Sequence, residues 1–74
     1  MYNYRAMTEE EKCFLIKGSQ WKHRNGCKYT VVGVANTRYI NPDYPIVIIY
    51  VGRNGHLWAK TLNDFMEKMS PFNG

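Results

Sequence analysis

Two tryptophans and a set of basic side chains are the residues of this chain whose chemistry points to a ligand. An aromatic ring stacks on a nucleobase with about 1–3 kcal/mol per base, and Lys, Arg or His cations make charge-assisted hydrogen bonds to phosphate. The candidate ligand-binding residues are Trp21, His23, Lys28, Arg53, His56, Trp58 and Lys60. The alternative is that Trp58 fills the core and the cations are solvated, because aromatic rings dominate small cores.

Patterns typical of enzymes and metal sites are absent from the sequence. His23, His56, Cys13 and Cys27 carry atoms suited to zinc, but they are scattered and no C-x-x-C or H-x-x-x-H motif brackets them. Three of the six acidic residues belong to one predicted helix start, and there is no nucleophile motif. We therefore predict a non-enzymatic binding module, with no catalytic residues, no metal and no cofactor.

The positive charge is concentrated in the middle of the chain. Residues 18–60 hold six basic residues against Asp43 alone, a net of +5, whereas residues 1–17 are neutral and residues 61–74 contribute −1. Such a segment favours anionic partners through long-range attraction. The alternative reading is ordinary surface charge, because a net charge of +4 is common for a small domain.

Two short helices are predicted at the ends of the chain. Thr8 followed by Glu11 has the spacing of a capping box, which predicts a helix over 8–17 that stops at Gly18. Near the C-terminus, apolar residues at i, i+3, i+4 and i+7 predict an amphipathic helix over 62–69 that begins after Thr61. The first helix has only a short apolar patch, so we expect it to pack on a sheet.

Four strands are predicted between the helices, over 19–24, 27–35, 46–51 and 56–60. Asn25-Gly26 between the first two predicts a type I′ hairpin turn with positive φ at both residues. This register predicts three cross-strand pairs: Arg24 with Cys27, Lys22 with Tyr29, and His23 with Lys28. Gly33 predicts a bulge or bend within its strand.

The predicted fold class is α+β: a small, strongly bent antiparallel sheet of about four strands, resembling an SH3-like barrel, with one helix at each end. A chain of 74 residues allows one domain, 1–74, with a β-rich core over 19–60. Because such a core buries only about 60% of the unfolded surface, we also expect a homo-oligomer.

The tripeptide Arg-Asn-Gly occurs twice, at 24–26 and 53–55. Turn chemistry accounts for the Asn-Gly half of each copy, because Gly accepts positive φ and Asn tolerates it. It does not require the arginines, so Arg24 and Arg53 remain open as ligand-binding candidates.

The longest apolar run, 46–51, is far shorter than a membrane span, and the first residues lack the apolar stretch of a signal peptide. We therefore expect a cytoplasmic protein with reduced cysteines and no membrane partner.

The central segment resembles a group of small bacterial and phage proteins, the domain of unknown function 1653 family. Members read as an aromatic with Arg/Lys-His, a Gly turn, Y-x-V-x-G-V-A, a variable loop, V-V-Y, and G-x-x-G-L-W-V-R-P-L-x-x-F. The matching residues are WKH at 21–23, Gly26, YTVVGVA at 29–35, IIY at 48–50, Gly55, LWAK at 57–60, Leu62 and Phe65. The similarity spans residues 21–66, although Lys60-Thr61 stands where the family has Arg-Pro. It implies a compact β-rich fold and a phage or bacterial setting, in the cytoplasm of a bacterial host.

Three binding functions are compatible with these observations, and a structural subunit with no ligand is a fourth alternative. The first is a phage protein that sequesters a nucleotide-type ligand and so antagonises host defence. The second is a nucleic-acid-binding SH3-like domain, which uses the same basic and aromatic residues. The third is an inhibitor of a host protein through the loop at 36–45, where tyrosine, arginine and proline gather.

Overall fold

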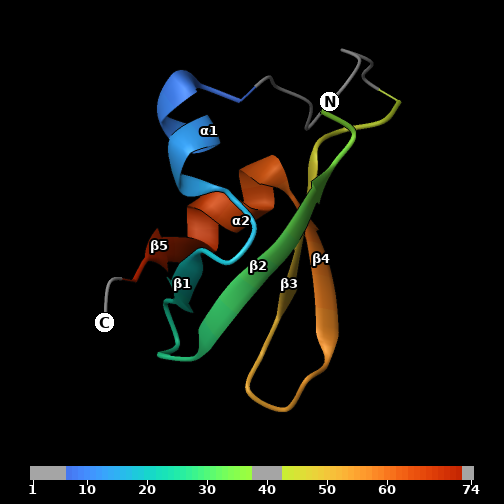
Figure 1. The fold of residues 1–74 in the computed structure, drawn as a ribbon. Coiled ribbons are helices and arrows are strands. Elements are labelled where there is room, and N and C mark those ends of the chain that lie inside the picture. The colour runs from blue at the N-terminus through green and yellow to red at the C-terminus, as the bar shows by residue number, and fades with distance from the viewer. Residues whose placement is uncertain (1–6, 38–42, 73–74) are drawn as a thin grey trace.

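The computed structural model describes residues 7–37 and 43–72, which form two helices and five strands. Figure 1 shows a twisted sheet with both helices beside it. In chain order the elements are α1 (Glu9–Phe14), β1 (Gln20–His23), β2 (Lys28–Ala35), β3 (Val47–Val51), β4 (Leu57–Thr61), α2 (Leu62–Lys68) and β5 (Met69–Pro71). The predicted α+β class is confirmed, and each predicted helix and strand has a counterpart.

The sheet has five strands, not four, and it is not closed into a barrel. Its order is β4-β3-β2-β1-β5, and every neighbouring pair is antiparallel. The additional strand, β5, follows directly from α2. Met69 leaves the helix with extended backbone, and residues 69–71 pair with β1. The sequence predicts only the end of a helix at this position, because Ser70-Pro71 stops a helix without indicating a strand.

The first helix is shorter than predicted. The capping box is present: Thr8 Oγ1 accepts from the Glu11 amide at 3.1 Å, and the Thr8 amide donates to Glu11 Oε1 at 3.0 Å. The helix nevertheless ends at Phe14, because the backbone of Leu15 leaves the helical region and its side chain enters the core. Gly18, at φ +91°, lies beyond the helix, in the turn that leads to β1.

The β1–β2 turn corrects the predicted register by one residue. Trp21 pairs with Tyr29 and Lys22 with Lys28, so the loop has three residues, Arg24 to Gly26. Only Gly26 takes positive φ in it, at +96°, and Asn25 does not. The Asn25 side chain accepts from the Cys27 amide instead, at 2.9 Å. This hydrogen bond closes the loop without the positive φ that a type I′ turn asks of Asn.

The bulge predicted at Gly33 is confirmed. The β2–β3 register runs from Val31 opposite Tyr50 to Gly33 opposite Ile49, which leaves Val32 as the extra residue. A bulge increases the local twist of its strand. It also lets Val31 and Val34 both pack toward the core.

The core lies between α2 and one face of the sheet. Its largest fully buried side chains are Trp21, Val31, Ile48, Leu62 and Phe65. Phe65 meets the rings of Trp21 and Tyr50 edge to face, with centroids 5.0 and 5.4 Å apart. Burial, and then the neighbouring Tyr29, raise the pKa of Tyr50 above its ordinary value.

Candidate functional site: a hollow between two turns

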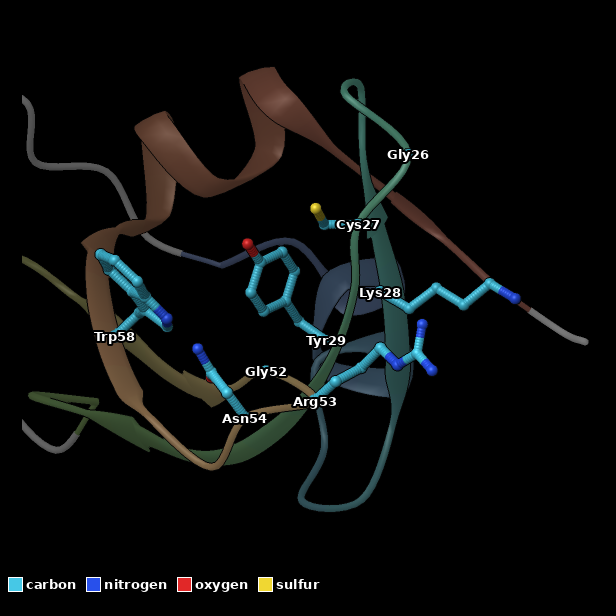
Figure 2. Close-up of a pocket in the computed structure, with 8 residues that line it drawn as sticks. All are labelled: Gly26, Cys27, Lys28, Tyr29, Gly52, Arg53, Asn54 and Trp58. Carbon is cyan, nitrogen blue, oxygen red and sulfur yellow. The ribbon is translucent and has the colours of Figure 1, made fainter.

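An open hollow of about 750 Å³ lies at the end of the sheet where the β1–β2 and β3–β4 turns meet. The antiparallel order brings these turns together, because Thr30 near the start of β2 pairs with Val51 at the end of β3. Eight residues line it, as Figure 2 shows: Gly26, Cys27, Lys28, Tyr29, Gly52, Arg53, Asn54 and Trp58. None of them is acidic.

The two Arg-Asn-Gly copies form turns of the same construction. In each, the Asn side-chain oxygen accepts from the amide two residues on, that of Cys27 or of His56. In each, the Gly has positive φ and its amide closes the turn on the carbonyl three residues back. Turn geometry therefore explains the Asn-Gly half of the repeat in both copies.

Tyr29 forms the middle of the hollow, and Gly52 and Tyr50 position its ring. A Cβ at Gly52 would lie 3.1 Å from Tyr29 Cε1, so the absence of a side chain lets the ring approach the backbone. On another side the ring meets Tyr50 edge to face, with centroids 5.1 Å apart. These contacts hold a half-buried aromatic ring at the surface of the hollow.

Trp58 stands on the far side of the hollow from the β1–β2 hairpin, on edge strand β4 (Figure 2). It pairs with the core residue Tyr50, so it lies on the core side of the sheet, but at the margin that α2 leaves open. Its side chain is 50% exposed. The structure therefore places Trp58 at the surface, and the alternative that it fills the core does not hold.

Lys28 and Arg53 extend away from Trp58, side by side, as Figure 2 shows. They also line a second hollow, of about 360 Å³, together with Gln20, Tyr29, Thr30, Val51, Gly52 and Phe72. The two hollows adjoin, since Lys28, Tyr29, Gly52 and Arg53 line both. We call these four shared residues the rim. Aromatic rings lie on one side of the rim, and cations extend on the other.

The remaining predicted site residues lie elsewhere. Trp21 is 1% exposed within the core, where its Nε1 donates to Ser19 Oγ, so its ring is not available to a ligand and we leave it out of the candidate site. The reason is the corrected hairpin register, which turns Trp21 toward α2 together with Tyr29. His23 Nδ1 accepts from the Asn25 amide within the turn.

His56 and Lys60 flank the hollow without lining it. His56 Nδ1 lies 3.3 Å from Asn54 Nδ2, so it contacts a lining residue. Lys60 lies two residues beyond Trp58 on the same side of β4 and is half-buried.

Five lining residues are not among the predicted site residues: Gly26, Cys27, Tyr29, Gly52 and Asn54. The two turn motifs could have indicated them. Once the strand order is known, the residues next to the two turns must lie close together. The order of the strands itself is not readable from the sequence pattern.

Both cysteines are exposed and free, Cys13 on α1 and Cys27 in the hollow. Within residues 7–37 and 43–72, no group of three or more His, Cys, Asp or Glu side chains is placed to hold a metal ion. The same residues contain no helix with the length and hydropathy needed to cross a bilayer.

Half of the loop predicted as a protein-contact surface, residues 38–42, lies outside the described residues, including Arg38 and Tyr39. At its described ends, the Asn36 side chain donates to the Pro45 carbonyl at 2.9 Å. Tyr44 is 62% exposed.

Comparison with protein-family models, with curated proteins and with solved structures found no match to this chain.

Proposed function

We propose that this chain is a non-enzymatic binding module for a nucleotide-type anion, held in the hollow between the two turns. The observation that carries the proposal is the half-exposed Trp58 across from Tyr29, in a hollow whose rim bears Lys28 and Arg53 and whose lining has no carboxylate. Aromatic faces suit a base, and cations suit phosphate.

The dimensions of the hollow support a small ligand. Its volume of about 750 Å³ lies in the range of roughly 300–1,000 Å³ typical of small-molecule sites. The lining also combines apolar and polar groups, since the indole and phenol rings adjoin the Asn54 amide. Such a mixture binds a ligand that has both an aromatic and a charged part.

The biological side of the proposal rests on the family resemblance. A phage protein of this kind would sequester a nucleotide signal of host defence, by binding it without turning it over. We further propose that it works as a homo-oligomer, because a 74-residue chain buries a small core and leaves several large apolar side chains exposed.

Calorimetric titration with mono-, di- and cyclic nucleotides tests the proposal. We expect heat at micromolar protein and a loss of affinity of about tenfold or more in Trp58→Ala, since stacking is worth about 1–3 kcal/mol per base. Tyr44→Ala is the control, because it removes another exposed aromatic ring that lies outside the hollow. No heat with any nucleotide, or equal loss in both variants, would contradict the proposal.

The two free cysteines provide a second measurement of where a ligand sits. A bound nucleotide should slow alkylation of Cys27, which lines the hollow, and leave Cys13 on α1 unchanged. Mass spectrometry of the two peptides gives both rates in one sample. Equal protection of both cysteines, or of neither, at saturating nucleotide would argue against this site.

Nucleic-acid binding is separated from nucleotide binding by ligand length and salt. A phosphate-backbone contact weakens steeply as salt rises and strengthens with oligonucleotide length. A nucleotide pocket should bind a mononucleotide as tightly as an oligonucleotide, with a shallow salt dependence.

A further inference from the structure

The cross-strand pair Lys22–Lys28 is the feature that the proposed function leaves unexplained. The two lysines are direct partners in the β1–β2 ladder and both are exposed. Like charges directly opposite one another destabilise a sheet. Within the described residues, neither lysine is paired with a carboxylate. Local departures from stabilising pairing are expected at functional sites.

These lysines lie on the face of the sheet away from the core. Trp21, Tyr29 and Val31 point inward, so the alternation of a strand turns Lys22, Lys28 and Thr30 outward. Arg53 joins them from the β3–β4 turn, since it lines the smaller hollow with Lys28 and Thr30. Lys28 and Arg53 therefore line one recess that has no acidic lining residue, and Lys22 lies opposite Lys28 on the same face of the sheet.

Phe72 holds one of these cations in place. The Lys28 ammonium lies 4.4 Å from the centroid of the Phe72 ring, within the range of a cation–π contact. The Phe72 amide in turn donates to the Gln20 carbonyl at 2.9 Å, which fixes the residue beside β1. An aromatic ring orients the ammonium without neutralising it, so its hydrogens stay available to an anion.

We infer that the smaller hollow is a phosphate subsite in which Arg53 and Lys28 bind the anion, Lys22 adds charge, and Phe72 positions Lys28. The inference rests on the proposed function in one respect: it places the phosphates of the nucleotide-type ligand on the outer side of the rim at Gly52, with the base on the side of Trp58. Gly52 lines both hollows, so it lies where they adjoin.

Inorganic pyrophosphate, titrated calorimetrically into the full chain at low salt, is the direct probe. We expect binding that weakens about tenfold or more in Arg53→Ala and in Lys28→Ala. Arg24→Ala should be unchanged, as it removes the equivalent arginine of the other turn, which lines neither hollow. Absence of binding, or equal weakening in Arg24→Ala, would overturn the subsite.

Two substitutions of Phe72 test whether its ring positions Lys28. Phe72→Tyr keeps the ring and should keep pyrophosphate affinity, whereas Phe72→Leu should lose several-fold. The NMR shifts of the Lys28 side chain should move only in Phe72→Leu, because only that change removes the ring current. Equal affinity in both variants would show that Phe72 does not position Lys28.

Adenosine and ADP separate the two proposals. If pyrophosphate binds in an Arg53-dependent way while neither adenosine nor ADP perturbs Trp58 fluorescence, the subsite stands and nucleotide binding fails. If ADP binding depends on Trp58 but not on Arg53 or Lys28, nucleotide binding stands and the subsite fails. If both hold, ADP should bind more tightly than either pyrophosphate or adenosine.

Discussion

At the scale of single residues, the two arginines of the repeated tripeptide differ in position although their turns match. Arg53 lines both hollows, and Arg24 lines neither. The turn construction accounts for Asn25, Gly26, Asn54 and Gly55, as expected from turn chemistry. Of the two arginines, only Arg53 therefore remains a ligand-binding candidate. Its neighbour Gly52 lacks a side chain, which lets the Tyr29 ring pack against the backbone.

We predict that Gly52→Ala destabilises the fold by about 1–3 kcal/mol and weakens nucleotide binding. The new Cβ would lie 3.1 Å from the Tyr29 ring, which already rests on Tyr50 and has little room to yield. Chemical denaturation measures the first effect, and the ring-current shifts of Tyr29 report the displacement. Unchanged stability with unchanged Tyr29 shifts would show that the ring can move aside freely.

At the scale of elements, local signals predicted what local chemistry determines. The capping box at Thr8, the bulge at Gly33 and the apolar face of α2 were all readable, because each depends on neighbours within a few residues. The β1–β2 register was not. An Asn-Gly pair is compatible with a loop of two or three residues, and burial of Trp21 beside Tyr29 selects the longer one.

The candidate site was predictable in part for the same reason. Trp58, Lys28 and Arg53 were identified from residue type, because an aromatic ring and cations have ligand chemistry wherever they lie. Tyr29 was missed because the predicted register put it opposite Lys22. That one-residue error also hid the lysine pair on which the phosphate subsite depends. Strand β5 was missed because its three residues carry no alternating pattern.

We predict different effects on stability for Gly→Ala changes at two glycines of the β1–β2 hairpin. Gly26→Ala should cost about 1–2 kcal/mol, since φ is +96° and an L-residue is strained there. Gly33→Ala should be neutral or stabilise by up to about 1 kcal/mol, because its φ is ordinary and no atom lies within 4 Å of the added carbon. Thermal or urea unfolding of both variants measures the difference, and equal destabilisation would contradict the turn geometry.

At the scale of the whole molecule, the two edges of the open sheet are unlike each other. β5 is three residues long and ends in proline, which limits pairing with another strand. β4 is five residues long, and it exposes Leu57, at 68%, Trp58 and Ala59. A long apolar edge is a template for pairing with another chain. We therefore assign the proposed self-association to β4.

Sedimentation equilibrium checks this assignment. The wild-type chain should exceed the 8.7 kDa of a single copy as its concentration rises. Leu57→Lys combined with Ala59→Lys should shift it toward a monomer, because edge lysines oppose strand pairing. Phe14→Lys, which changes an exposed apolar residue on α1, is the control. A wild-type chain of 8.7 kDa at every concentration, or an associated double variant, would rule out β4 as the interface.

The pairing of β1 with β5 ties early residues of the chain to late ones, and this has a consequence for the order of folding. Local hairpins such as β3–β4 close quickly, whereas contacts between distant segments form slowly. The Trp58 side of the rim depends mainly on the local hairpin. Phe72 lies just beyond β5, so its contact with Lys28 can form only after the distant segments have met. In a refolding experiment, nucleobase stacking should therefore recover before phosphate affinity does.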